Sequence, residues 1–240
     1  MNAPYPGPDP HYGNLPYGHA PPSHGDIHER LLATPFEAVA PHLRLVLFGG
    51  DATGLGGDKL AYSINPTLTA VLAYRLDPGS FQSALLEQRH AQAWAMNKRD
   101  LWFSALHNMA YDQYRIDTYP GAPDTASYVV TGLTWPASAH VMRLSDLIAE
   151  PMPYGAVAMA PEPNTLICAV LRSKRSAPVI PAMHLIFCDR IIDGVPLTDQ
   201  LLWWRGGSVS GMPMRPSADG GVQVRQSPEF SYLLDYELPD

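Results

Sequence analysis

The sequence predicts an α+β fold: a mostly antiparallel sheet with packed helices, preceded by a disordered N-terminal arm. Three observations predict it. Apolar residues form 46% of the 240 residues, enough for a packed core. One strong amphipathic helical pattern stands among short apolar runs of strand length. Proline occurs 25 times, which favours short elements because its ring removes a backbone donor and interrupts helices and strands.

Charge is scarce and its balance is acidic. Only 16% of residues are charged and the formal net charge is −7. Binding to a nucleic-acid backbone needs a basic surface, so we disfavour nucleic acid as a partner. We find neither a signal peptide at the N-terminus nor an apolar run of about 18 residues, and we therefore expect no membrane contact and a cytoplasmic location.

The chain divides into three predicted segments. Residues 1–26 are rich in Pro, Gly, Tyr and His and cannot bury enough apolar area to offset their ordering entropy, so we expect a disordered arm. It is either an inert tail or an extended ligand that orders on binding. Residues 27–227 are expected to form a single α+β domain. Residues 228–240 form an acidic and aromatic strand or docking tail.

In the first part of the domain, short helices and two strands are expected. Asp26 and Thr34 are placed to cap helices over residues 26–32 and from residue 35 onward. Apolar runs at 43–48 and 68–76 read as strands of a hairpin, joined by a long, partly glycine-rich loop. A helical pattern follows over residues 80–94.

The clearest helix is predicted to begin after Asn97 and to end near Arg115. Asn97 with Asp100 three residues later resembles a capping box. An apolar stripe at helical spacing follows: Leu101, Trp102, Ala105, Leu106 and Met109. Residues 116–119 should be extended, and Pro120-Gly121 should turn the chain.

The second half predicts further short strands. Strands are expected at 127–133, 156–160, 165–171, 201–205 and 222–225, with helices near the end of 137–149 and over 180–192. The tight turn at 161–164 makes a hairpin of the second and third of these strands. Glycines and prolines dominate residues 206–221. Cys168 and Cys188 follow or lie within apolar runs, so both are expected to be buried thiols rather than a disulfide.

The last segment alternates apolar and polar residues at strand period. Its apolar positions are Phe230, Tyr232, Leu234, Tyr236 and Leu238. We favour a strand that completes the chain's own sheet, because an open edge promotes aggregation. The alternative is an extended peptide that adds to the sheet edge of a partner.

A family resemblance rests on three stretches. They are Trp102 to Asn108, with its Ala-Leu-x-Asn pattern; Gly155 to Pro161 leading into Asn164 to Ile167; and Pro196 to Thr198 before Leu201 to Trp203. Over roughly residues 68–205 the chain resembles the YtpQ-like family of uncharacterised bacterial proteins. The resemblance implies a fold and a bacterial origin and no activity. Sparse lysine with abundant alanine, proline and glycine suits an actinobacterial source.

Known catalytic motifs are incomplete in this sequence. Gly49 and Gly54 have the spacing of a phosphate-binding loop, but Leu55 stands where that motif needs lysine. No serine between 206 and 211 has glycine two residues away on both sides, as a nucleophile elbow requires. The histidines after residue 30 are scattered along the sequence and no Cys-x-x-Cys occurs, so we expect no metal and no cofactor. His24 and His28 are four apart, but we expect no fold there to preorganise a site.

Two neighbouring polar residues of the main helix are candidates for a polar pocket. Asn108 lies beside the apolar stripe, where an amide without partners costs about 1–3 kcal/mol. His107 lies among aromatic residues. The functional interpretation is a pocket on a rigid helix; the structural one, which we favour, is an amide that ties the helix to a nearby loop.

Other candidates are a basic cluster and an aromatic one. Arg172, Lys174 and Arg175 could hold an anion, although a solvated loop is the simpler interpretation. Trp203, Trp204 and Arg205 are of the residue types that dominate protein interfaces. Strand alternation should expose one of the two tryptophans beside Arg205. With this triplet we group Phe230, Tyr232 and Tyr236 of the last segment as candidate partner-binding residues.

Two functions follow from these observations. The first is a non-catalytic bacterial protein that binds a protein partner, within a larger assembly or alone; it rests on the incomplete motifs, the tryptophan pair and the unusual termini. The second is an enzyme, of hydrolase type, with a dispersed site that includes His107 and Asn108. A small-molecule ligand is left open by the sequence.

Overall fold

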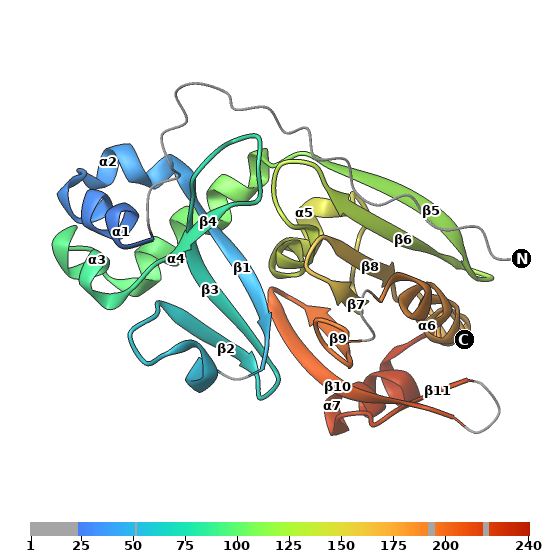
Figure 1. Ribbon diagram of the computed structural model, residues 1–240. Coiled ribbons are helices and arrows are strands. Elements are labelled where there is room, and N and C mark those ends of the chain that lie inside the picture. Colours follow the sequence, from blue (N-terminus) through green and yellow to red (C-terminus); the bar gives the residue numbers. More distant parts are fainter. Residues whose placement is uncertain (1–23, 51, 192–194, 218–220) are drawn as a thin grey trace, which may run out of the picture.

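The computed structural model describes residues 24–50, 52–191, 195–217 and 221–240. It contains two antiparallel sheets with helices packed around them, which confirms the predicted α+β class (Figure 1). The arm expected at 1–26 lies almost wholly outside the described residues. No helix in the described ranges is both long and apolar enough to cross a membrane.

The first sheet is small and lies in the N-terminal part of the chain. Its strands are β1 (Leu43–Gly49), β2 (Ala61–Asn65), β3 (Leu68–Arg75) and β4 (Ser83–Leu85). The order is β1-β3-β2, and β4 also pairs with β3. The predicted hairpin of β1 and β3 is confirmed, with Leu43 opposite Tyr74. The sequence did not reveal β2, which lies inside the long loop and pairs with the other edge of β3.

Three short helices cover one end of this sheet. They are α1 (His24–Ala33), α2 (Phe36–Val39) and α3 (Gln88–Ala93). The first begins before Asp26, and the second begins after Pro35 rather than with a side-chain cap from Thr34. The helix expected over 80–94 is wrong in its first half. There β4 runs antiparallel to β3, and the helix begins only at Gln88.

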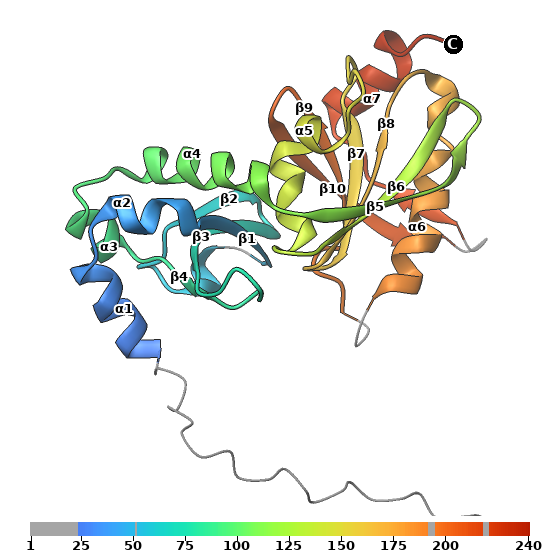
Figure 2. The same ribbon diagram turned by 90° about the horizontal axis from the view of Figure 1, so that it is seen from above.

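The main helix, α4 (Lys98–Asn108), begins where predicted. The Asn97 side chain accepts a hydrogen bond from the Asp100 backbone N–H at 2.9 Å. The helix lies across the small sheet (Figure 2) and buries Leu101 and Ala105. It ends earlier than expected, and a 3₁₀ turn follows (Met109–Tyr111). The next residue, Asp112, is buried against Arg44, which draws the chain out of the helical path.

The second sheet has seven strands. They are β5 (Tyr114–Ala122), β6 (Thr125–Gly132), β7 (Ala156–Glu162), β8 (Thr165–Val170), β9 (Gln200–Arg205), β10 (Ser208–Pro216) and β11 (Val222–Val224), in the order β11-β10-β9-β7-β8-β6-β5. The predicted hairpin of β7 and β8 is confirmed, with Ala156 opposite Val170. The turn predicted at Pro120-Gly121 is wrong, because these residues lie within β5. The glycine- and proline-rich segment 206–221 contains β10, which the sequence did not reveal.

Helices cover both faces of the seven-stranded sheet. On one side lies α6 (Val179–Arg190), and on the other a 3₁₀ segment (Ala137–Arg143) continues into α5 (Leu144–Leu147) (Figure 2). One hydrophobic cluster extends from the small sheet to the inner face of the large one, and a second lies between the large sheet, α6 and the C-terminal segment. Cys168 is buried as predicted. Cys188 is exposed on α6, contrary to the prediction.

The predicted C-terminal strand is wrong, because the segment is helical. It forms α7 (Pro228–Tyr232) and a π-helical turn (Leu233–Glu237). Ser227 caps α7 by accepting a hydrogen bond from the Phe230 backbone N–H at 3.2 Å. Phe230 and Leu233, three residues apart, are both fully buried, and this helical spacing outweighs the alternation read from the sequence.

Candidate functional site

The two tryptophans of β9 point to opposite faces of the sheet, as strand alternation predicts, yet neither is exposed. Trp203 packs in the cluster under α6 and the C-terminal helix, and Trp204 in the cluster between the two sheets. Their relative exposures are 6% and 7%. The expectation of one exposed tryptophan is therefore wrong. Other elements cover both faces of β9. The alternation of side chains along the strand therefore sends one tryptophan into each of two hydrophobic clusters.

Arg205 links the end of β9 to the C-terminal helix. Its Nη2 donates to Glu237 Oε2 at 2.6 Å, and its guanidinium carbon lies 5.7 Å from the centre of the Trp203 ring. The Trp203 ring in turn meets Phe230 edge to face, with centroids 5.2 Å apart. Phe230 is thus an anchor of the helix rather than a contact residue. This packing fixes the direction in which the rest of α7 faces solvent.

Two tyrosines remain on the exposed side of this helical segment. Tyr232 is 56% exposed and Tyr236 is 75% exposed, and their ring centroids are 5.1 Å apart. An open hollow of about 430 Å³ lies beside them, lined by Arg205, Pro228, Glu229, Tyr232 and Glu237. We call Arg205, Glu229, Tyr232, Tyr236 and Glu237 the acidic-aromatic face. The structure thus brings together three of the six residues predicted to bind a partner, and buries the other three.

The polar residues of α4 lie in a second open hollow. Asn108 Nδ2 donates to the carbonyl oxygens of Ala40 at 2.6 Å and Leu43 at 3.1 Å, so the amide ties the helix to the chain before β1. This is the structural role favoured from the sequence. His107 is exposed and meets the edge of Tyr111, with ring centroids 5.7 Å apart.

The hollow beside α4 lacks the arrangement of a hydrolase. It measures about 480 Å³ and includes Ser104 and His107. The Ser104 hydroxyl donates to the Asp100 carbonyl oxygen at 2.9 Å. Among the residues that the structure describes, no hydrogen bond joins Ser104 to His107 and no carboxylate lines the hollow. A serine nucleophile would need both a base and a group that orients it.

The basic cluster after β8 is largely paired with carboxylates. Arg172 forms an ion pair with Glu150, and Lys174 Nζ lies 3.0 Å from Asp240 Oδ1. Arg175 is exposed. The cluster holds the C-terminus and the segment before β7 against the end of β8. These pairs reduce the charge that the candidates Arg172, Lys174 and Arg175 could offer to an external anion.

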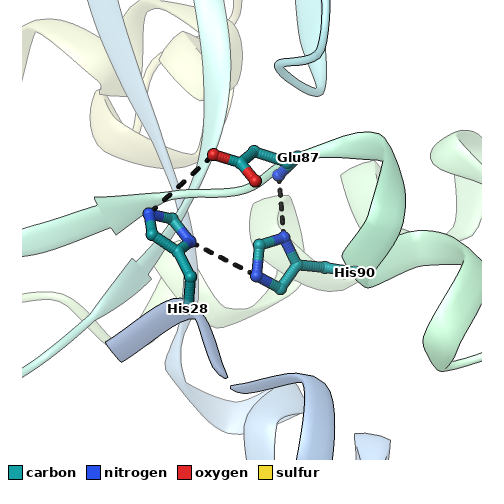
Figure 3. A group of neighbouring side chains, drawn as sticks. All are labelled: His28, Glu87 and His90. Carbon is teal, nitrogen blue, oxygen red and sulfur yellow. Dashed lines mark hydrogen bonds and ion pairs between the residues drawn. The ribbon is translucent and has the colours of Figure 1, made fainter. Parts of the chain in front are cut away.

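The structure also assembles a group that the sequence did not predict. His28 on α1 lies beside Glu87 and His90 at the start of α3 (Figure 3). His28 Nδ1 is 3.3 Å from His90 Nε2, and His28 Nε2 is 4.0 Å from Glu87 Oε1. Two nitrogens about 3.3 Å apart match two ligands of a tetrahedral ion with bonds of about 2.0–2.1 Å. By composition and distance this is a metal-binding set.

Its hydrogen bonds, however, occupy the lone pairs that a metal would need. The Glu87 backbone N–H donates to His90 Nδ1 at 3.0 Å. Burial lowers the pKa of His90, so its ring is neutral and carries its single proton on Nε2. That N–H donates to His28 Nδ1, and the other ring nitrogen of His28, Nε2, lies 4.0 Å from Glu87 Oε1. A metal-binding histidine instead donates its second N–H to an acceptor.

The carboxylate of this group is also engaged. Glu87 Oε1 accepts from Lys59 Nζ at 2.7 Å, and Oε2 accepts from Arg89 Nε at 2.6 Å. These hydrogen bonds, that from Lys59 above all, lower the pKa of Glu87 to about 2. The cluster is therefore a closed network that joins α1 to α3. Part of this network could have been recognised in the sequence, since Glu87 and His90 have the spacing of a capping box. The contact with His28 could not, because it joins residues 62 positions apart.

Comparison with known proteins gives no relative for this chain. No protein-family model, no curated protein and no solved structure matches it.

Proposed function

We propose that the protein is a non-catalytic interaction protein that binds a protein partner through the acidic-aromatic face. One observation carries this proposal: Tyr232 and Tyr236 are large, exposed and adjacent, on a helix that Phe230 fixes to the core. Exposed aromatic side chains on a rigid support are typical of interface hot spots, because little entropy is lost when they are covered.

The chemistry of this face favours a partner that presents basic side chains. Glu229 and Asp235 are exposed on the same helical segment as the two tyrosines, and the whole chain carries a net charge of −7. Glu237 already pairs with Arg205, which orients its carboxylate along the hollow. An arginine or lysine of the partner would find carboxylates for its charge and tyrosine rings for its stem. We therefore propose a basic segment of another protein as the ligand.

The setting that we propose is the bacterial cytoplasm. It rests on the amino-acid composition and on the resemblance of residues 68–205 to the YtpQ-like family. The hydrolase alternative gains no support from the hollow beside α4, because the Ser104 hydroxyl and the Asn108 amide both donate to backbone carbonyls.

Peptide selection tests the proposal directly. A display library of random peptides is selected on the immobilised full-length protein, and then counter-selected on the variant Tyr232→Ser/Tyr236→Ser. We expect enrichment of peptides that combine Arg or Lys with an apolar residue, and loss of their binding to the variant. The matched control is Tyr111→Ser, which removes an equally exposed tyrosine near the end of α4.

The outcomes separate the possible readings. Enriched peptides that bind the double variant as well as the wild type would contradict the proposed face. Enrichment of acidic or uncharged peptides would contradict the proposed partner chemistry. Failure to enrich any peptide would contradict the proposal that this surface binds a linear segment.

A further inference from the structure

A cavity of about 170 Å³ lies between the end of the main helix and the segment that leads into α5. Its lining residues are Met109, Ala110, Tyr114, His140, Arg143, Asp146 and Leu147. It shares no lining residue with the acidic-aromatic face. Since each water molecule takes about 30 Å³ in the liquid, the cavity has room for a ligand of only a few heavy atoms.

His140 lines the cavity, and one of its ring nitrogens is buried without a partner in the described part of the chain. The His140 side chain belongs to a residue only 3% exposed, and its Nε2 makes no hydrogen bond in the described part of the chain. Burial, with Arg143 and Arg44 nearby, lowers the pKa of His140 to about 4, so the ring is neutral at pH 7. A buried polar group left without a partner costs about 1–3 kcal/mol. A ligand that completes this hydrogen bond recovers that cost.

The charged side chains around His140 indicate whether a ligand in the cavity should be positive or negative. Arg143 Nε and Nη2 both donate to Asp146 Oδ2, at 3.1 and 2.8 Å, and this pair is neutral overall. A second group contains one carboxylate and two guanidinium groups. Asp112 accepts from Arg44 Nε at 2.9 Å and from Arg75 Nη1 at 3.4 Å. The side-chain exposures of Asp112, Arg44 and Arg75 are 1%, 4% and 13%, so one positive charge in excess is buried there.

The two groups lie within electrostatic range of each other. Arg44 acts on the pKa of His140, and Arg143 acts on the pKa of Asp112. An excess charge of this kind is costly in the interior unless an opposite charge compensates it. His42 adds no charge of its own, because burial and the two arginines lower its pKa. In a chain of net charge −7, this is a local region that favours an anion.

We propose that this cavity binds a small oxyanion, either a carboxylate or a phosphate. One ligand oxygen accepts a hydrogen bond from His140 Nε2–H, and Arg143, whose Nη1 is not engaged by Asp146, supplies a charged donor. The excess positive charge of the Arg44–Asp112–Arg75 group stabilises the ligand from behind. The Tyr114 ring, 5.7 Å from the His140 ring and edge to face with it, keeps the imidazole in place.

Side-chain NMR of the histidines tests the proposal on the full chain. Inorganic phosphate is titrated into ¹⁵N-labelled protein at constant ionic strength and pH 7, and acetate is titrated in a second series. We expect a saturable shift of the His140 ring nitrogens in at least one series, and a higher pKa for His140 with the ligand bound. His184 on α6 and exposed His107 serve as internal controls whose signals stay in place.

The variant Arg143→Gln provides the matched comparison. Removing one charged donor should weaken binding by about tenfold or more, whereas Arg190→Gln at the end of α6 should leave it unchanged. Saturation by phosphate alone identifies a phosphate site, and saturation by acetate identifies a carboxylate site. Shifts that grow linearly with either salt, or that are the same in Arg143→Gln, would overturn the proposal; the wild-type titration decides it even if the variant does not fold.

Discussion

Two histidine-containing sites in this molecule differ in whether their ring nitrogens already have hydrogen-bond partners, and this difference decides what each site can bind. In the His28–Glu87–His90 group, each ring nitrogen of His90 and the Nδ1 of His28 is already part of a hydrogen bond. In the cavity beside α5, His140 Nε2 has no partner in the described part of the chain. The first group has the composition of a metal site, and the second has a ring nitrogen without a partner beside a positive charge.

The difference teaches that proximity of ligand-type side chains does not make a site. A metal needs lone pairs, and the Glu87 backbone N–H fixes the tautomer of His90 so that its Nε2 carries a proton. An anion needs donors and a positive potential, and both remain open around His140. Substitutions in the two groups should therefore differ in their effects on stability and binding.

The largest effect is expected from Asp112→Ala. It leaves Arg44 and Arg75 without their shared carboxylate in the interior, and removing one partner of a buried ion pair costs about 3–5 kcal/mol. Urea unfolding measures the free energy. The control is Asp146→Ala, whose side chain is 59% exposed and should cost no more than about 1 kcal/mol. Equal losses in the two variants would show that no buried charge excess exists at this site.

The next effect is the dependence of stability on pH. The pKa of His140 lies at about 4 in the folded protein, below its unfolded value of 6.5, so the unfolded state binds more protons between these values. Stability should therefore fall as pH is lowered from about 6.5 to 4, by about 3 kcal/mol from this residue. His90 acts in the same direction.

Unfolding experiments at pH 7 and pH 4.5 measure this loss. In His140→Gln, whose side chain cannot titrate, the free energy of unfolding should differ much less between the two pH values than it does in the wild type. An unchanged difference would assign the acid sensitivity to other groups and would contradict the neutral, buried state of His140.

A smaller effect is expected in the closed group. His90→Ala removes the acceptor of the Glu87 backbone N–H and the contact with His28, at a cost of about 1–3 kcal/mol. Exposed His107→Ala is the control and should stay within about 0.5 kcal/mol. A loss in His90→Ala as small as in the control would mean that the network does not hold α1 to α3.

The smallest effect on stability belongs to the acidic-aromatic face. Tyr232→Ser/Tyr236→Ser should change the free energy of unfolding by no more than about 0.5 kcal/mol per residue, because both rings are exposed. Peptide binding should nevertheless be lost. A large loss of stability would show that these tyrosines support the fold, and it would remove the reason to call the face a binding surface.

Much of the fold could be predicted from local patterns. The Asn97 cap, the apolar runs of β1, β3, β7, β8 and β9, and the turn between β7 and β8 are set by neighbouring residues. Predictions failed where distant contacts decide. Residues 230–238 alternate like a strand, but the Ser227 cap and burial of Phe230 against Trp203 favour a helix. Both tryptophans of β9 are buried because elements far along the chain cover both faces.

The candidate sites were predictable only in part. Residue type alone points to Arg205, Tyr232 and Tyr236, and the structure places them on one face. The roles of His140 and of His28 with His90 could not be read from the sequence. Those roles depend on which nitrogen meets which partner, across separations such as the 62 residues between His28 and His90.

The most direct test of the central claim is a set of titrations read at every histidine side chain. Zinc is added to one sample, phosphate to a second and acetate to a third. We expect His28 and His90 to keep their ring signals at a stoichiometric amount of zinc, and His140 to shift to saturation with phosphate, with acetate or with both. Tight zinc binding at His28 and His90, with no response of His140 to either anion, would contradict the central claim.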